Sequence, residues 1–389
     1  MTAQPGIDTD LYSDSAIRDP FPVYRAIRDL GPLVWLSAHD MWAVGRHVDV
    51  RQALLADSVL LSGHGVAANS FVNAEPARVT LTTDGDLHRR LRSVVMKPMT
   101  RSGLRDVHDE VRRLAETLID ELTSREHFDG VVDFARLLPV SIVSRLVGLP
   151  DDGRERMLDW AAAIFDALGP ANDRGMAAFP LAMEMAAFAA GMDRARLNPD
   201  GWAARLFGAA DAGLVEHGDV PGMLIDYIAP SLDTTILASG HLLFELGSHP
   251  EQWELLRSTP GLVAGAVDET LRMHAPVRAF TRFASEDVAF GDATLAAGQR
   301  VLVIFGSANR DERRYADPDR FDITRDAKDH VGFGYGSHRC AGAFLAELEM
   351  ESLLLAMIPR VKAIEVGEPK VLHNNVLHGY ESFPASFRT

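Results

Sequence analysis

One cysteine lies in a segment whose neighbours could tune it as a metal ligand. Cys340 is the only cysteine among 389 residues, and it lies in Phe333-Gly-Tyr-Gly-Ser-His-Arg-Cys-Ala-Gly342. Gly334 and Gly336 allow a tight turn beneath a flat group, because glycine adopts conformations that other residues avoid. Backbone amides at the start of the helix expected over 344–358 can donate to a thiolate and lower its pKa. The segment therefore favours a working thiolate, and a buried structural thiol is the alternative.

The sequence resembles the cytochrome P450 family, the haem-thiolate monooxygenases. The positions that match the family's haem-binding loop are Phe333, Gly334, Gly336, His338, Cys340 and Gly342. The resemblance extends over nearly the whole chain. It implies that Cys340 is the axial ligand of the iron of haem b, with Phe333, Gly334 and Gly342 in the loop that holds the haem. It also implies O2 as a co-substrate.

A second match concerns an ion network that supports this loop. Glu269-Thr-Leu-Arg272 resembles the family's Glu-x-x-Arg motif, and Arg320 in Pro318-Asp-Arg-Phe321 resembles its third member. Glu269 and Arg272 are one helical turn apart, so both project from one face and can form a buried, hydrogen-bonded network with Arg320. We expect this network to be structural.

The resemblance also implies cationic partners for the two haem propionates, because buried carboxylates require them. His88 and Arg92, four residues apart, match the family's first propionate-binding helix, and Arg282 and His338 match the other positions. Without the resemblance, a solvated basic face would be an equally good interpretation of His88 and Arg92.

Oxygen activation is expected on a long helix. Asp233 and Thr234 match the acid and alcohol that deliver protons to bound dioxygen in the family, and an ordinary polar pair is the alternative. Upstream, Pro230-Ser231 departs from the usual Ala or Gly followed by Gly. Proline lacks an N–H and collides with the carbonyl four residues back, so we expect a kink there, with the Ser231 hydroxyl free to hold water or to touch substrate.

The substrate is less well indicated. By position in the family, the expected pocket residues are Phe71, Phe165, Ile228, Ser231, Phe280 and Phe383. Such side chains suit a small, flat, apolar molecule, although each phenylalanine alone is more often plain core. Several segments are similar to bacterial members that hydroxylate or O-demethylate methoxylated aromatics. His64 takes the place of an arginine that binds benzoate carboxylates, which favours a guaiacol-type methoxyphenol, giving a catechol and formaldehyde, over a methoxybenzoate. A terpenoid hydroxylase of the same family is a further alternative.

Electrons should come from NAD(P)H through a ferredoxin or a flavin or iron–sulfur reductase, because the chain has no segment for such a cofactor. A local basic patch for this donor consists of Arg89, Arg90, Arg101, Arg105 and Arg339, and simple solvation explains them equally well. A peroxygenase and a haem sensor are the competing functions. The Asp233-Thr234 pair argues against the peroxygenase, since peroxide already carries its protons.

The composition of the chain argues against several kinds of binding partner and against a disulfide-bonded protein. With 39 basic and 55 acidic residues, the net charge is −16, which argues against nucleic acid and anionic membranes as partners. A single cysteine cannot form an intramolecular disulfide. We find no secretory signal and no apolar run of about 18 residues, so we expect a cytoplasmic protein.

The elements that position these residues are mostly helical. Apolar groups recur every three or four residues over 104–123 and 136–148, and helices are also expected over 176–195, 219–247 and 344–358. Strand signals are fewer: a hairpin at 288–295, a strand at 301–305 and a weaker hairpin at 35–44. The sequence predicts a mainly α fold with minor antiparallel β, the cytochrome P450 fold, in one haem-enclosing domain over 1–389. The β-rich parts are expected at about 33–60 and 277–305.

Overall fold

The computed structural model describes residues 5–389, and helices make up most of that part of the chain. The helices are α1 (Asp14–Arg18), α2 (Phe21–Leu30), α3 (His47–Leu55), α4 (Ser70–Ala74), α5 (Gly85–Val95), α6 (Arg105–Thr123), α7 (Leu137–Val147), α8 (Asp151–Ala167), α9 (Asp173–Ala190), α10 (Trp202–Asp211), α11 (Val220–Ile228), α12 (Asp233–Ser248), α13 (Pro250–Ser258), α14 (Val263–Met273), α15 (Phe305–Ala308) and α16 (Ala343–Met357).

Apolar spacing places several of these helices correctly. α6 buries Val107, Val111, Ala115, Leu118, Ile119 and Leu122 on one face, which is the pattern that predicted it. α7 ends at Gly148, whose φ of 76° closes the helix in the left-handed conformation. α9 begins and ends earlier than the expected 176–195, and Gly191 follows it.

The helix expected over 219–247 is interrupted. α11 ends at Ile228, α12 begins at Asp233, and residues 229–232 between them are not helical. Pro230 lies inside this interruption, as its missing N–H requires. The expected kink is therefore a complete break of the helix.

The strands form one larger sheet and three small ones. They are β1 (Gly6–Ile7), β2 (Val34–Leu36), β3 (Met41–Val44), β4 (Leu60–Leu61), β5 (Phe128–Asp129), β6 (Ala279–Ala284), β7 (Val288–Phe290), β8 (Ala293–Leu295), β9 (Arg300–Ile304), β10 (Ala363–Val366), β11 (Lys370–Val371), β12 (Tyr380–Ser382) and β13 (Pro384–Arg388). The six-stranded sheet has the order β1-β2-β3-β9-β6-β4, mostly antiparallel, with parallel pairs at β1–β2 and β3–β9. The strands from β10 onward, and β5, lie outside the β-rich parts that the sequence indicated.

Side-chain alternation explains the two-sided packing of the larger sheet. Trp42 and Val301 belong to one buried cluster, whereas their neighbours Met41 and Leu302 belong to another. Successive side chains of a strand point to opposite faces, so β3 and β9 contribute to both clusters. The sheet is thus buried on each side.

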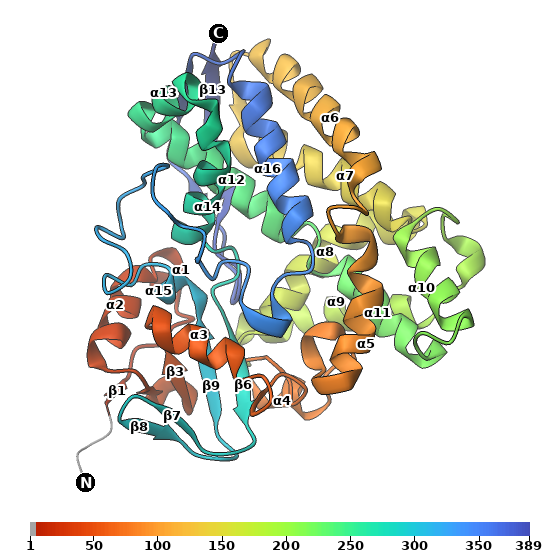
Figure 1. Cartoon of the computed structure of the whole chain (residues 1–389), viewed down its shortest axis with the longest axis vertical. Helices are drawn as coiled ribbons and strands as arrows, with labels where there is room; N and C mark the ends of the chain where they lie inside the picture. Colours follow the sequence, from red (N-terminus) through yellow and green to blue (C-terminus); the bar gives the residue numbers. More distant parts are fainter. Residues whose placement is uncertain (1–4) are drawn as a thin grey trace.

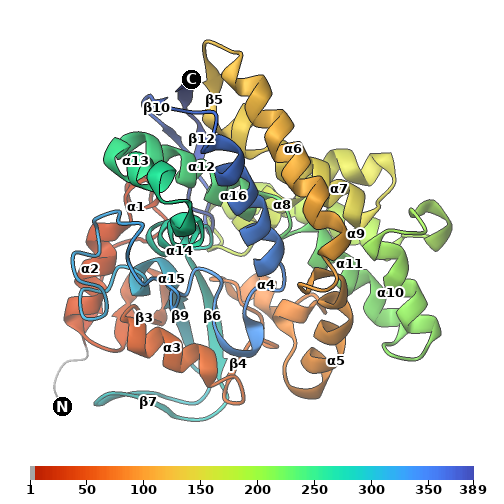
Figure 2. The same ribbon diagram turned by 45° about the horizontal axis from the view of Figure 1, so that its top comes forward.

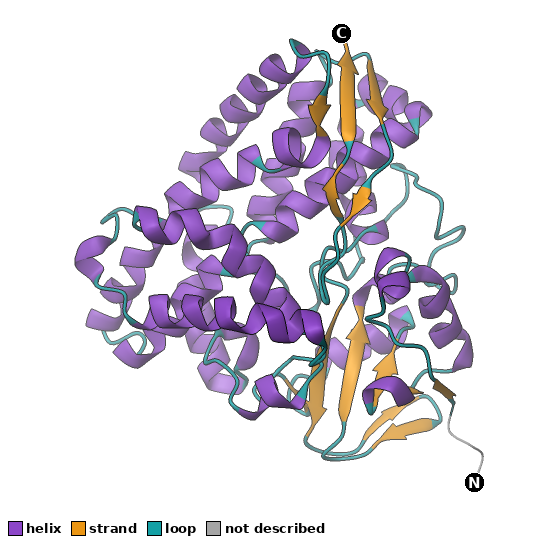
Figure 3. Cartoon of the chain, turned by 180° about the vertical axis from the view of Figure 1, so that it is seen from behind, coloured by secondary structure: helices purple, strands orange, loops and turns teal. Residues whose placement is uncertain are grey.

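The helices and sheets occupy different regions of the molecule. Most helices lie on one side, with the six-stranded sheet near the N-terminus and the β10-β13-β5 sheet near the C-terminus (Figure 3). α16 and α6 run side by side (Figures 1 and 2) and share the main helical core with α12. Among the described residues, no helix is both long enough and apolar enough to cross a membrane.

Candidate functional site

The cysteine loop, residues 333–342, connects the irregular segment after α15 to α16. The Cys340 amide donates to the Phe333 carbonyl at 2.8 Å, which closes the loop. Gly334 and Gly336 have φ of 69° and 72°, and a Cβ on Gly336 would lie 2.6 Å from the Leu54 carbonyl oxygen of α3. Both glycines are therefore required by backbone conformation, and the second also by close contact with α3.

Opposing effects act on the pKa of the Cys340 thiol. The residue is exposed by surface area, yet surrounding protein desolvates the sulfur, and this raises its pKa. The Gly342 N–H and the charges of Arg92 and Arg339 act in the opposite direction and favour the thiolate. A cation bound at the sulfur would complete this stabilisation.

The four residues expected at the propionates converge beside this loop. The His88 and His338 rings lie 4.1 Å apart, and Arg92 donates to the Arg339 carbonyl. Burial lowers the pKa of His88 to about 4 and that of Arg282 to about 10. Among residues 5–389, the buried Nε2 of His88 has no hydrogen-bond partner, and the buried Arg282 guanidinium is bonded only to the Thr281 carbonyl, at 2.8 Å.

The break between α11 and α12 brings Ser231, Asp233 and Thr234 together. Ser231 Oγ donates to the Tyr227 carbonyl at 2.5 Å, and Thr234 Oγ1 donates to the Pro230 carbonyl at 3.1 Å. These hydroxyls occupy backbone carbonyls that the interrupted helix leaves unpaired. Burial raises the pKa of Asp233 to about 7, so its carboxyl can hold or release a proton near neutral pH.

The ion network around Glu269 differs from the prediction in its third member. Glu269 accepts from Arg272 Nε at 2.6 Å and Nη2 at 2.9 Å, and both side chains are fully buried. The other cation is Arg325, whose Nε donates to Glu269 Oε1 at 3.0 Å. Arg320 is 64% exposed and pairs with Asp322 at 3.3 Å, so its assignment to the network is wrong. Arg325 also donates to the carbonyls of Ala316, Asp317 and Arg320, which hold its guanidinium beside Glu269.

A small apolar cluster contains part of the expected substrate wall. Phe165, Leu237, Val376 and Leu377 are buried together, with Val277 and Phe280 packed against them. Two expected members lie elsewhere. Phe71 is 59% exposed and packs edge-on against Phe179, and Phe383 belongs to the helical core, against Phe244 and Gly130.

Two other residues that the substrate prediction uses also lie outside this apolar cluster. Ile228 is the last residue of α11 and is buried in the main helical core. His64 is exposed, and its ring stacks on Phe283 with 4.3 Å between centroids. A stacked, exposed imidazole is a poor carboxylate anchor.

The loop between β4 and α5 is bonded to helices at two places. Near its apex, the Ala68 amide donates to the Leu168 carbonyl at 2.8 Å, and Asn69 Nδ2 donates to the Ala167 carbonyl at 3.1 Å, both at the end of α8. Farther along, the Thr80 amide and hydroxyl donate to the Asp226 carboxylate of α11 at 3.0 and 2.9 Å.

Gly222 permits the second of these contacts. A Cβ on Gly222 would lie 1.8 Å from the Arg78 carbonyl oxygen, so only glycine allows α11 to approach the loop so closely. Sequence reasoning did not find Gly222 or Asp226, because neither contact leaves a local signal.

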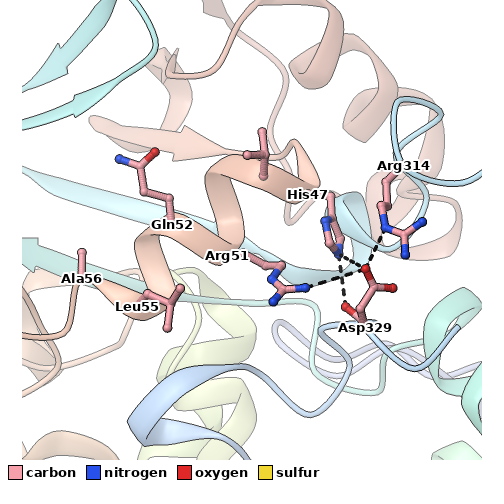
Figure 4. A pocket seen from close by; sticks show the side chains of 8 residues that line it. His47, Arg51, Gln52, Leu55, Ala56, Arg314 and Asp329 are labelled. Atoms are coloured by element: carbon pink, nitrogen blue, oxygen red, sulfur yellow. Dashed lines mark hydrogen bonds and ion pairs between the residues drawn. The ribbon is translucent and has the colours of Figure 1, made fainter.

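An open pocket of about 730 Å³ lies along α3, with Arg314 and Asp329 also in its lining. Two arginines and a histidine converge on one carboxylate: Arg314 Nε lies 2.7 Å, Arg51 Nη1 3.7 Å and His47 Nε2 3.9 Å from Asp329 Oδ2 (Figure 4). Arg51 also lies over the Tyr335 ring, 4.0 Å from its centroid. This group therefore braces the cysteine loop through Tyr335, and its charges are already paired.

Comparison with known proteins identifies the family. The family model for cytochrome P450 matches residues 214–377. The chain is 34% identical to cytochrome P450 CYP199A2 of Rhodopseudomonas palustris over 98% of this chain and 94% of the relative. The chain belongs to the cytochrome P450 family. It is also 30% identical to linalool 8-monooxygenase of Pseudomonas putida over 96% of each P450.

A solved P450 supports the same conclusion at the level of structure. Mycobacterium marinum CYP268A2 in complex with pseudoionone superposes with a TM-score of 0.87 at 26% identity, covering all of both chains. The fold class predicted from the sequence is confirmed, and the protein is a P450 monooxygenase that uses haem iron, O2 and electrons from a partner protein.

The residues around Cys340 fit a haem. Buried cations and buried ring nitrogens are costly unless they are paired. The lone Nε2 of His88 and the carboxylate-free guanidinium of Arg282 lie close to His338, which also feels the charge of Arg92. The two propionates of a haem would supply the missing acceptors, and Cys340 would supply the thiolate ligand.

Proposed function

We propose that this P450 O-demethylates a small methoxylated aromatic molecule, with a guaiacol-type methoxyphenol as the preferred substrate. The observation that carries the proposal is the apolar wall formed by Phe165, Leu237, Leu377 and Phe280. Such a wall suits a flat apolar ring with few polar anchors. Oxidation of the aryl methyl group gives a hemiacetal, which collapses to a catechol and formaldehyde.

The proposed roles of the chain's own residues follow from their positions. Cys340 is the proposed iron ligand. His88, Arg92, Arg282 and His338 hold the propionates, and Phe333, Gly334 and Gly342 shape the loop. When bound, the haem supplies activation of O2 and insertion of one oxygen atom. Asp233 holds a proton near neutral pH, and Thr234, adjacent at the helix break, passes it toward the oxygen site through water.

A methoxybenzoate is a less suitable substrate. His64 stacks on Phe283 at the surface and offers no cation to a carboxylate inside the pocket. A terpenoid is the second candidate, and two findings favour it: the similarity to linalool 8-monooxygenase, and the aliphatic share of the wall from Leu237 and Leu377. The two candidates differ in whether an aromatic ring is required.

The electron donor is proposed to dock near the cysteine loop. Arg101 lies 4.9 Å from the centroid of the Phe344 ring at the start of α16, and Arg339 precedes the cysteine. Arg89, Arg90 and Arg105 are exposed nearby on α5 and α6. Asp86 pairs with Arg89, Glu347 with Arg339, and the buried Asp219 with Arg90. This patch suits an acidic ferredoxin or a reductase that draws on NAD(P)H.

A spin-state titration of the haem-loaded protein tests the substrate. Guaiacol, 4-alkylguaiacols, a methoxybenzoate and linalool are added separately, and the loss of iron-bound water is followed in the absorption spectrum. We expect guaiacols to bind most tightly and, with NAD(P)H and redox partners, to give equal amounts of catechol and formaldehyde. A shift with linalool alone would establish the terpenoid alternative. Equal turnover with peroxide alone would establish a peroxygenase, and absence of any product would favour a haem sensor.

A further inference from the structure

Three histidines from distant parts of the sequence meet in the interior. His241 lies on α12, His274 directly follows α14, and His378 precedes β12. One ring nitrogen of each lies within 4.8 Å of those of the other two. His241 is fully buried and His274 is 6% exposed. None of the three belongs to the residues assigned above to haem, protons or substrate.

Four ring nitrogens of this cluster have no hydrogen-bond partner among the described residues. Within residues 5–389, no hydrogen-bond partner exists for Nδ1 and Nε2 of His241, Nδ1 of His274 or Nδ1 of His378, all of them buried. Nearly all buried polar atoms in proteins have a partner. A group that accepts lone pairs from several nitrogens at once would remove this deficit.

A carboxylate orients one of these rings for such a role. Glu245 Oε1 lies 2.6 Å from Nε2 of His274 and accepts its proton, which leaves the lone pair on the unpartnered Nδ1. Metal-binding histidines commonly donate their second N–H to a carboxylate in this way. Glu245 is itself buried, so its negative charge also compensates a cation in the cluster.

The charge state of the cluster suits a metal as well. Burial lowers the pKa of all three histidines, so the rings are neutral and their lone pairs are available. Arg310 and Arg278 act on the rings; Arg310 pairs with Asp319 at 3.0 Å, which reduces its repulsion of a bound ion.

We propose that His241, His274 and His378 form a binding site for a divalent transition metal, zinc in the first instance. Three imidazoles without an oxygen-rich shell match zinc and do not match magnesium or calcium. Glu245 acts as the positioning residue behind His274.

Metal binding requires one local rearrangement. All three rings lie in nearly parallel planes: the His241 plane is 13° from that of His274 and 22° from that of His378, and the last two differ by 10°. Zinc–nitrogen bonds of about 2.0–2.1 Å require convergent lone pairs and nitrogens about 3.3 Å apart. The His241 and His378 rings must therefore turn about their Cβ–Cγ bonds, while His274 keeps its bond to Glu245; no side-chain partner holds the two His241 nitrogens or Nδ1 of His378.

An occupied site would stiffen the apolar wall. Leu237 lies one turn before His241 on α12, and Leu377 adjoins His378. Val277, which packs against the wall and is counted with it here, lies three residues after His274. A metal would therefore join the three segments that carry these wall residues. This consequence rests on the proposed function, whereas the metal site does not.

The test measures zinc uptake by the haem-loaded protein. Protein is dialysed against Zn²⁺ in excess Mg²⁺, and zinc per haem iron is determined by mass spectrometry for the wild type, His241→Leu, His378→Gln and the surface control His127→Leu, whose side chain is 77% exposed. We expect one tight zinc in the wild type and the control, with affinity at least ten times weaker in both cluster variants. Zinc-edge X-ray absorption should show nitrogen neighbours at 2.0–2.1 Å.

Two results would overturn the proposal: equal zinc uptake by the wild type and the cluster variants, or a zinc shell of oxygen alone. An unchanged reduced carbon monoxide spectrum shows that a variant is folded. If one of the two cluster variants fails to fold, the other still tests the proposal. The zinc measurement uses no substrate, so a negative result would not affect the proposal of an aromatic substrate. Equally, a negative spin-state titration would not affect the proposed metal site.

Discussion

Truncation of Arg325 should destabilise the protein far more than truncation of Arg320. The Glu269 carboxylate is fully buried and accepts four hydrogen bonds, from Arg272 twice, from the Asp322 amide and from Arg325. Arg325→Ala removes one charge-assisted bond, worth about 1.5–3 kcal/mol. It also removes donors from the carbonyls of Ala316, Asp317 and Arg320, so we expect a cost of about 2–4 kcal/mol in total. The exposed pair of Arg320 is worth about 0–1 kcal/mol.

The assay compares thermal midpoints of the haem-loaded variants at one scan rate. With about 2.1 cal/mol/K of unfolding entropy per residue, 389 residues give about 0.8 kcal/mol/K. Arg325→Ala should therefore lower Tm by about 3–5 °C, and Arg320→Ala by about 1 °C or less. The reduced carbon monoxide spectrum reports whether the cysteine loop is intact. If Arg320→Ala proved as destabilising as Arg325→Ala, the network drawn from the structure would be refuted.

The site residues can be tested one side chain at a time. Cys340→Ser should lose the reduced carbon monoxide spectrum of a thiolate-ligated haem, and its retention would contradict the ligand assignment. Arg282→Met should release haem to an acceptor apoprotein about tenfold faster or more, since it deletes a buried charge-assisted bond; Arg89→Ala, at a side chain 69% exposed, should not. The pKa of Asp233 is raised from 3.8 to about 7 by burial, so the folded protein binds the extra proton and stability falls as pH rises between these values. Asp233→Asn should therefore gain stability relative to the wild type at pH 8 compared with pH 5, and an unchanged difference would show an ordinary pKa.

Features set by local spacing could be predicted from the sequence. The three- and four-residue apolar pattern of α6 and the Gly-Asp turn between β7 and β8 act within a few residues, and both elements are present. The glycines before Cys340 also signal their own conformation, because only glycine adopts a positive φ cheaply.

Features set by distant contacts could not be predicted. Arg320 and Arg325 are five residues apart and equally cationic, and the choice depends on a bond to Glu269, 56 positions away. Phe383 was grouped with the pocket by position, but its ring fills the space that Gly130 leaves in the helical core. Pro230 located the interruption of the long helix, whereas its extent depends on hydroxyl groups that satisfy the freed carbonyls.

The two attachments of the loop between β4 and α5 have a mechanical consequence. The loop is bonded to the end of α8 at Ala68 and Asn69, and to α11 at Thr80. The stretch from 74 to 77 lies between these attachments, and in the described part of the chain no backbone hydrogen bond joins it to α8 or α11. While these bonds hold, opening of this side carries the end of α8 with it, so we expect substrate to enter at the pace of a helix movement rather than at that of a loop.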